Sequence, residues 1–345
     1  MKIVVRGTNW IGDAVMQIPA LRQLRRVFPA ANITLHTRTW AQGIFEDADF
    51  LDEILTFEKT ESKIKDALAQ AKILREKNYD LAVLFPNSFE SALVAKLASI
   101  PKRFGYATDA RGLLLTDAVT VPEWKTTRHE VFYYLNLVAA VEKKIVGAET
   151  VLADAPKIDL EVSGDRKTRA RRMLAENGVN TSRKVVALGV GSTNSRAKRW
   201  SAERYAELND RLQNEANADV ILVGAADELE VSNEVYERSK NKPIILTGKT
   251  DLAEAAAILS LVDLLVSNDM GLAHVASAVG AKTLVIFGPT NPRTTRPWNA
   301  EIIYKNVECS PCMLRDCPID HRCMTRISAD EVFSKAVQMI YDKIS

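Results

Sequence analysis

The stretch that decides the fold is "KIVVRGTNWIGDAVMQIPALRQLRR", residues 2–26. A short apolar run leads through Gly7 into a segment near 13–28 whose apolar residues recur at helical spacing. A strand, a turn and a helix in this order are the start of a βαβ unit. Asp13 stands in the turn, where loops that hold phosphate usually avoid negative charge. The purpose of this lone carboxylate is the first functional question that the sequence raises.

The same alternation of apolar strands and helical segments continues along almost the whole chain. It predicts parallel sheets built from βαβ units, and 345 residues are too many for one ordinary core. The weakly periodic segment 147–165 is typical of a linker. We therefore predict an α/β protein with two Rossmann-like, doubly wound domains that face a central cleft. The predicted parts are the domains 1–160 and 161–327, and a C-terminal helix, 328–345, that is capped by Ser328 and packs back toward the first domain.

The composition is that of an ordinary globular protein. It argues against a strongly basic nucleic-acid-binding protein and against a membrane-spanning one. With 46 basic and 44 acidic residues the net charge is +2, so the balance implies no strong nucleic-acid field. The N-terminus lacks the pattern of a secretory signal, and no apolar run approaches the roughly 18–20 residues of a membrane-spanning helix. We expect a cytoplasmic protein, with at most peripheral contact at the inner face of the membrane.

The stretch "VSNDMGLAHVASAVGAKTLVIFGPTNP", residues 266–292, predicts an anion site in the second domain. An apolar strand ends just before Asp269, and Gly271 then opens an Ala-rich helix whose free N–H groups can hold a phosphate. His274 would lie in the first turn of that helix. The alternative is structural, with Asp269 as an N-cap and His274 facing the core.

Two further loops follow strands of the same domain. "GVGSTNSRAKRW", residues 189–200, combines small polar residues with Lys198 and suits a diphosphate, although it is not a Walker A motif. A merely solvated basic loop is the alternative. In "LVGAADELE", residues 222–230, Asp227 or Glu228 could accept ribose hydroxyls, or the two could be an ordinary exposed pair at a helix start.

Four stretches together resemble the ADP-heptose:lipopolysaccharide heptosyltransferases, family 9 of the glycosyltransferases. They are "NWIGDAVMQIPALRQLRR", "LFPNSFESALVAKLASIPKRFGY", "GSTNSRAKRW" and "SNDMGLAHVASAVGAKTLVIFGPTNP". The second of them is most similar to the heptosyltransferase II group, which adds the second inner-core heptose. The resemblance implies a GT-B fold, an inverting mechanism, no catalytic cofactor, an ADP-L-glycero-D-manno-heptose donor and a Kdo-lipid A inner-core acceptor.

The resemblance also implies roles for individual residues. Asp13 matches the proposed general base, which takes a proton from the acceptor hydroxyl; the alternative is that it caps a helix. Lys198 would stabilise the departing ADP, and Glu228 would bind the ribose. The remaining donor-binding residues would be Thr193 and Asn194 near the diphosphate, Thr250 near adenine, Asp269 at the heptose hydroxyls, the main chain of Met270, Gly271 and Leu272 at the phosphates, and His274.

Acceptor binding is less readable from the sequence. The inner core of lipopolysaccharide carries carboxylates and phosphates, so cations of the first domain are candidate contacts. Lys102, Arg103 and Arg111 are the residues that we predict. Surface solubility explains such residues equally well.

All four cysteines fall in one short segment with the spacing C-x2-C-x4-C-x5-C: Cys309, Cys312, Cys317 and Cys323. Four clustered thiols can enclose a structural zinc or iron ion. Reduced thiols or redox pairs are the alternative.

Other functions remain open at this point. The chain could be heptosyltransferase I or III, or a family 9 enzyme with another nucleotide sugar or acceptor. From different classes, it could be a non-catalytic nucleotide-sugar-binding protein or a zinc-ribbon protein that binds nucleic acid. The near-neutral charge and the absence of interleaved basic and aromatic residues argue against the last of these.

Overall fold

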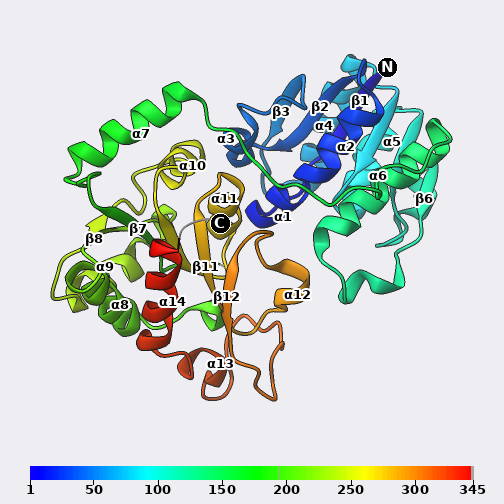
Figure 1. Ribbon diagram of the computed structural model, residues 1–345. Helices are drawn as coiled ribbons and strands as arrows, with labels where there is room; N and C mark the ends of the chain where they lie inside the picture. The colour runs from blue at the N-terminus through cyan, green and yellow to red at the C-terminus, as the bar shows by residue number, and fades with distance from the viewer. Residues whose placement is uncertain (194, 343–345) are drawn as a thin grey trace. The chain divides into compact units, whose positions relative to one another are not determined.

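The computed structural model describes residues 1–193 and 195–342 of the chain. It divides into two compact units, Met1–Ile158 and Asp159–Ser345. Each unit holds a six-stranded parallel sheet with helices on both faces, so the predicted α/β class is confirmed (Figure 1). The division falls two residues before the predicted boundary after residue 160.

The sheet of the first unit has the strand order β3-β2-β1-β4-β5-β6. The central strands are continuous apolar runs, as parallel strands covered on both faces must be. All neighbouring strands in it are parallel, with Arg6 of β1 opposite His36 of β2 and Leu84 of β4. The strands are β1 (Lys2–Arg6), β2 (Asn32–Arg38), β3 (Glu53–Phe57), β4 (Leu81–Leu84), β5 (Lys102–Tyr106) and β6 (Asp117–Val119).

Helices cover both faces of this sheet. The helices α4 and α5 pack together on one face, and α2 and α6 pack together on the other (Figure 1). The helices are α1 (Ile11–Met16), α2 (Ile18–Val27), α3 (Gln42–Phe45), α4 (Lys63–Lys77), α5 (Phe89–Leu97) and α6 (Glu130–Ile145).

The single helix predicted near 13–28 is in fact two, because α1 ends at Met16 and α2 begins at Ile18. Pro19 lies at the start of α2, where its missing N–H costs nothing, but one continuous helix would place it in the interior. The short α1 is therefore a separate element that carries Asp13 in its first turn.

The sheet of the second unit has the order β12-β11-β10-β7-β8-β9 and is again parallel. Its longest strands are fully buried along most of their length. The strands are β7 (Lys184–Gly189), β8 (Ala218–Leu222), β9 (Ile244–Ile245), β10 (Leu264–Asn268), β11 (Lys282–Phe287) and β12 (Glu301–Tyr304).

Capping residues define several helix starts in this unit. The Ser201 hydroxyl accepts a hydrogen bond from the Arg204 N–H at the start of α8, and Asp251 and Glu254 form a reciprocal capping box at α10. The helices are α7 (Gly164–Glu176), α8 (Ala202–Asn214), α9 (Leu229–Arg238), α10 (Leu252–Leu259), α11 (Gly271–Ala278), α12 (Pro292–Thr295), α13 (Arg322–Thr325) and α14 (Ala329–Tyr341).

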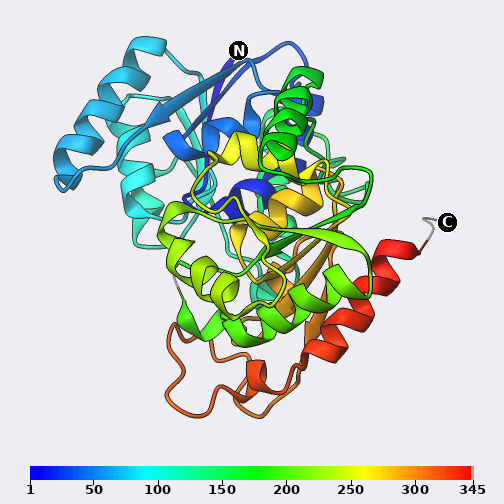
Figure 2. The ribbon, with the colours of Figure 1, turned by 90° about the vertical axis from the view of Figure 1, so that its left-hand side faces the viewer.

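The C-terminal helix α14 begins where we predicted, with the Ser328 hydroxyl as its cap. It belongs to the second unit, however, and lies along α8 (Figure 2). Its apolar stripe, which includes Val332 and Ala336, is buried in the core that β7, β8 and β10 share with α8. The apolar face of this helix is thus used within its own unit, and packing toward the first domain stays a prediction.

Among residues 1–193 and 195–342, no helix has both the length and the apolar character needed to cross a membrane.

Candidate functional site

The strand orders place a topological switch point in each sheet. In the first unit the order reverses at β1, which lies between β2 and β4, and in the second at β7, which lies between β10 and β8. Ligands of open parallel sheets bind beyond the carboxyl ends of the strands at such points. The chain leaves β1 toward Asp13 and leaves β7 toward Lys198. Each of the two predicted catalytic residues therefore follows the strand at which its sheet reverses.

In the second unit, Lys198 and Asp269 form an ion pair. The Lys198 Nζ lies 2.8 Å from Asp269 Oδ2, and the Thr290 hydroxyl donates to the same oxygen at 2.7 Å. Asp269 is almost fully buried, whereas about a quarter of the Lys198 side chain is exposed. The three residues follow the adjacent strands β7, β10 and β11, so the pair spans the switch point and joins two predicted site residues.

The loop that carries Lys198 is fixed from two sides. The fully buried Asn268 accepts a hydrogen bond from the Trp200 N–H (2.9 Å) and donates to the carbonyl oxygens of Val190 (2.9 Å) and Gly191 (3.0 Å). From the other side, the Ala197 N–H donates to the carbonyl oxygen of Arg315 at 2.9 Å. The position of the lysine is thus preorganised by buried polar contacts.

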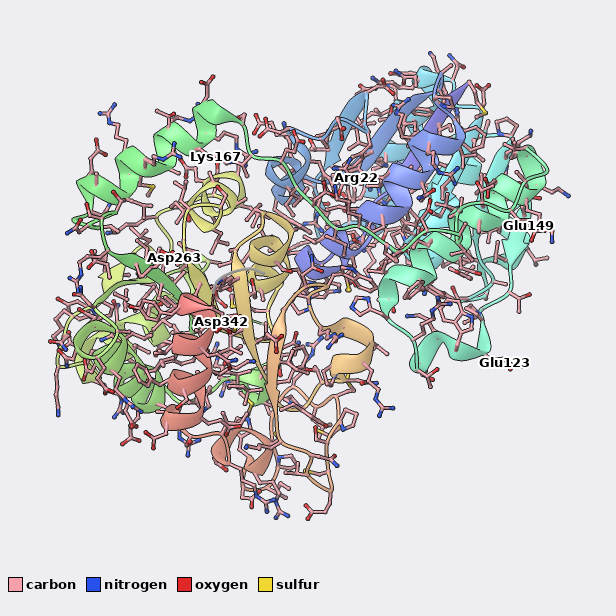
Figure 3. All side chains as sticks on the ribbon, in the orientation of Figure 1. Arg22, Glu123, Glu149, Lys167, Asp263 and Asp342 are labelled. Atoms are coloured by element: carbon pink, nitrogen blue, oxygen red, sulfur yellow. The ribbon has the colours of Figure 1, made fainter. Side chains whose placement is uncertain are left out.

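The amino-terminal end of β10 carries a different lysine–aspartate pair, which is more exposed to solvent. Asp263, labelled in Figure 3, precedes β10, and its carboxylate pairs with the Lys184 ammonium at 2.7 Å. This partly exposed pair joins the amino-terminal ends of β7 and β10. It holds the two strands in register at the edge of the sheet that ligands do not use.

Glu228 is a buried carboxylate at the carboxyl end of β8, with only 3% of its surface exposed. It accepts hydrogen bonds from the Ala225 N–H (3.0 Å) and the Thr193 hydroxyl (3.4 Å). Burial raises the pKa of this carboxyl, although the Ala225 N–H counteracts the rise. Its neighbour Asp227 is exposed, so the alternative of an exposed pair does not describe Glu228.

Glycines make the space that Glu228 occupies. A Cβ atom built on Gly191 would lie 2.2 Å from Glu228 Cδ, and one built on Gly224 would lie 2.6 Å from Glu228 Oε2. The loop after β9 lies beside the loop that carries Gly224, because the Gly248 N–H donates to the Gly224 carbonyl oxygen at 3.0 Å. Thr250, two residues further on, is half-buried in this loop.

The helix α11 begins at Gly271, two residues after Asp269, with Met270 at its N-cap position and no side chain as a cap. The N–H groups of Gly271 and Leu272 lie at this uncapped start. His274 is buried in the first turn, with 5% of its surface exposed. Asp269 precedes the cap, so the alternative in which Asp269 caps the helix is wrong. The predicted residue Asn194 lies outside the described residues.

A hollow of about 1020 Å³ opens beside Thr193. It is lined by the starts of α8 and α9 and by α13, and its charged residues include Arg196, Arg199, Arg204 and Asp227. Neither Glu228 nor Asp269 lines it. We therefore place the candidate site at the strand ends, where the buried polar groups converge, and not in this hollow.

In the first unit, Asp13 contacts a tyrosine from a distant part of the sequence. The Tyr134 hydroxyl, from α6, donates to Asp13 Oδ1 at 3.3 Å. Burial and the nearby Asp13 carboxylate raise the pKa of Tyr134 well above its usual value, so the hydroxyl keeps its proton and is the donor. Phe85 and Tyr133 pack edge-on against the Tyr134 ring and fix it. Asp13 lies inside α1, behind the N-cap residue Trp10, and so is not a helix cap.

Two of the three predicted acceptor-binding cations lie away from Asp13. Lys102 and Arg103 begin β5, beside Leu81 at the start of β4, and so lie at the sheet edge opposite Asp13. The Arg103 guanidinium donates to the carbonyl oxygens of Leu114 and Ile100. The parallel strands therefore hold Lys102 and Arg103 about a strand length away from the edge that carries Asp13.

Arg111 is fully buried and has a structural role. Its guanidinium donates to the Tyr106 carbonyl oxygen at 2.8 Å and to the Ser91 hydroxyl at 3.0 Å, and also contacts the Pro86 carbonyl oxygen. Burial lowers its pKa to about 10. A guanidinium used in this way holds the loop after β4 and is not displayed to a ligand.

The four cysteines are free thiols. Cys309 and Cys312 are exposed, Cys317 is half-buried and Cys323 is buried. Burial raises the pKa of the Cys323 thiol, and the charge of the three other cysteines raises it further. Within the part of the chain that the structure describes, no three His, Cys, Asp or Glu side chains are arranged to hold a metal ion. The predicted structural zinc or iron site is therefore not supported.

Sequence reasoning missed several residues of these sites. Tyr134 gives no local signal, because it lies 121 positions from the aspartate that it contacts. Thr290 belongs to the turn "FGPTNP", and its position after β11 could have marked it as a member of the ligand edge. Asn268 is a buried amide at the end of an apolar strand, and that unusual position is a readable signal.

The two units are both Rossmann-like, and the second places a helix start without a side-chain cap beside the Lys198–Asp269 pair, an arrangement suited to binding an anion. The chain belongs to glycosyltransferase family 9 (heptosyltransferase), whose sequence pattern matches residues 67–322. Its GT-B class and its activity as a glycosyltransferase follow from this membership.

Known relatives match nearly the whole chain. Lipopolysaccharide heptosyltransferase 2 of Salmonella typhimurium is 31% identical, over 86% of this chain and 85% of its own length. The structure of E. coli ADP-heptose lps heptosyltransferase II is 28% identical, with a TM-score of 0.84 over 99% of this chain and 98% of that one. The family 9 glycosyl transferase of Veillonella parvula shares the fold at 22% identity, with a TM-score of 0.86 and coverage of 99% and 98%.

Proposed function

We propose that the protein transfers L-glycero-D-manno-heptose from ADP-heptose to the first heptose of the lipopolysaccharide inner core, as a heptosyltransferase II. The observation that carries the proposal is the Lys198–Asp269 pair at the switch point of the second sheet. Relatives named for this activity, matched over more than four-fifths of the chain, support it.

In the proposed reaction, the acceptor hydroxyl oxygen attacks the anomeric carbon of the donor. The bond from that carbon to the diphosphate oxygen breaks, and ADP leaves with the bonding electrons. Asp13 accepts the hydroxyl proton, and the transfer inverts the anomeric configuration. A side chain that takes up this proton in the transition state commonly contributes about 10²–10⁴-fold to the rate.

The second unit holds the donor in this proposal. The Lys198 ammonium stabilises the charge that develops on ADP, in place of a metal ion, and Asp269 binds heptose hydroxyls. Glu228 binds the ribose, and the start of α11 offers its N–H groups to the phosphates. Thr193, Thr250 and His274 complete the donor contacts.

The acceptor sugar is anchored to lipid A, so we also propose that transfer takes place during peripheral contact with the inner face of the cytoplasmic membrane.

The deciding experiment measures ADP release from ADP-L-glycero-D-manno-heptose with Kdo2-lipid A as acceptor, with and without one heptose attached. Release only with the heptose-bearing acceptor supports heptosyltransferase II. Release with the heptose-free acceptor indicates heptosyltransferase I instead. No release with either acceptor, while ADP-heptose still binds, would favour a different acceptor or a non-catalytic binding protein.

We expect Gly191→Ala to weaken ADP binding by about tenfold or more. The new Cβ would overlap Glu228 Cδ, so the carboxylate must leave the position from which it binds the ribose. A hydrogen bond to a charged group is commonly worth about 1.5–3 kcal/mol. Isothermal titration with ADP measures the change. Gly164→Ala is the matched control, because a Cβ there meets nothing within 4 Å; equal affinities in the two variants would contradict the assignment of Glu228.

We expect Tyr134→Phe to lower kcat at neutral pH by about tenfold, the rate equivalent of ~1.4 kcal/mol. A base works in its ionised form, so activity falls as the pH falls. Without the hydroxyl donor the ionised carboxylate is less favoured, and this fall therefore occurs at a higher pH than in the wild type. A pH–rate profile tests the shift. Tyr341→Phe removes a hydroxyl bonded to the Ala216 carbonyl oxygen and should leave the profile unchanged.

A further inference from the structure

The turn between β1 and α1 departs from local sequence preference at Trp10. This residue occupies the N-cap position of α1, where Ser, Thr, Asp and Asn are preferred, and its side chain makes no capping hydrogen bond. A missing cap leaves the start of a helix less stable. The indole is also 55% exposed, so it gains little from burial in return. A residue that breaks a local rule without structural gain is a marker of function.

Trp10 also lies one helical turn from the proposed base. The Ala14 N–H donates to the Trp10 carbonyl oxygen at 2.8 Å, which closes the first turn of α1. Trp10 and Asp13 are three positions apart, a spacing that brings two side chains to the same side of a helix. The indole and the carboxylate therefore start from positions three residues apart, at the N-cap and in the first turn of α1.

The residues before Trp10 have unused hydrogen-bonding capacity. Thr8 is 5% exposed, and its hydroxyl oxygen has no hydrogen-bond partner among the described residues. The amide oxygen of Asn9 likewise has none in the described part of the chain. The Thr8 N–H, by contrast, donates to Gln17 Oε1 at 3.2 Å, so the backbone of the turn is held in place. Buried polar groups are normally paired, so these two oxygens retain the capacity to accept a hydrogen bond from a ligand or a water molecule.

We propose that residues 8–10 form the subsite for the acceptor sugar ring that carries the attacking hydroxyl. A pyranose ring has an apolar C–H face and a rim of hydroxyl groups. The broad, electron-rich face of the exposed indole matches the first, and the side chains of Thr8 and Asn9 match the second. This subsite recognises the neutral ring of the acceptor next to Asp13 and needs none of the three cations predicted from the sequence. It rests on the proposed function, because it takes Asp13 as the base.

The test compares Trp10→Ala and Trp10→Phe with the wild type in ADP release, with the heptose-bearing Kdo2-lipid A as the varied substrate. We expect Trp10→Ala to raise the acceptor KM by about tenfold or more, since the variant loses the apolar face on which the acceptor ring would pack. Trp10→Phe should recover part of the loss. ADP affinity and the slow hydrolysis of ADP-heptose without acceptor should not change in either variant.

Leu113→Ala is the matched control, because Leu113 is an apolar side chain of the same unit that is 92% exposed. If the wild type is active and Trp10→Ala has an unchanged acceptor KM, the proposed subsite is overturned while the proposed function stands. If the wild type released no ADP with any acceptor, the proposed function would fail first. The subsite would then be tested by titration of the deacylated acceptor oligosaccharide, and equal binding by the wild type and Trp10→Ala would reject it.

Discussion

Asp13→Asn is expected to lower kcat by about 10²–10⁴-fold, the range that a positioned general base commonly supplies. The amide has the shape of the carboxylate and can still contact the Tyr134 hydroxyl, so the geometry of α1 should persist. It cannot accept the proton of the acceptor hydroxyl. Single-turnover measurement of heptose transfer, rather than KM, reports this step directly.

Two comparisons make the result specific to the base. Asp49→Asn changes an exposed carboxylate of the same unit that pairs with Arg22, and it should retain full activity. ADP affinity should be the same in Asp13→Asn and the wild type, because the proposed donor contacts are all in the second unit. A kcat within a few-fold of the wild type would reject Asp13 as the base and leave the fold and the donor site untouched.

Lys198→Ala is expected to lower kcat by about 10²–10³-fold, as the loss of one preorganised electrostatic contact to developing charge commonly does. Unlike Asp13→Asn, it should also weaken the binding of ADP, because the product carries the charge that the ammonium faces. Asp269 keeps the hydrogen bond from the Thr290 hydroxyl, so its position should survive the loss of the ion pair. Kinetics and ADP titration on the same preparations separate the two effects.

The control for this variant is Lys305→Ala, which removes a lysine of the same unit that pairs with Glu331. It should leave both kcat and ADP affinity unchanged. Addition of EDTA should not slow the wild type if a lysine, and not a metal ion, stabilises the leaving group. Normal turnover by Lys198→Ala would remove the lysine from the mechanism.

The Lys198–Asp269 ion pair bears on how the donor would bind. In the structure the ammonium is already neutralised by a carboxylate that we assign to the donor sugar. Under the proposed roles, we expect donor binding to redirect both groups, with the lysine turning to the diphosphate and the aspartate to the heptose hydroxyls. Without the donor, each charge of the pair neutralises the other. This pairing lowers the desolvation free energy of keeping the Asp269 carboxylate nearly buried.

Local sequence was sufficient for the parts of this protein that depend on neighbouring residues. Apolar strands that end in glycine-containing turns predicted two parallel sheets, and Ser328 marked the start of α14 correctly. Lys198, Glu228 and Asp269 each follow an apolar strand in the sequence, and the parallel sheet brings them to one edge of the second unit. Each of these features follows from hydrogen bonding or periodicity within a few residues.

Tertiary structure alone decided what depends on residues far apart in the chain. The contact between Tyr134 and Asp13, the burial of Arg111 and the separation of Lys102 from Asp13 all follow from strand order and helix packing. The destination of α14 was equally unreadable, because an amphipathic stripe shows that a helix must pack but not against which sheet. The sequence determines which side chains carry charge. The fold determines which groups they contact, because burial and distance decide which charged groups and hydroxyls come within bonding range.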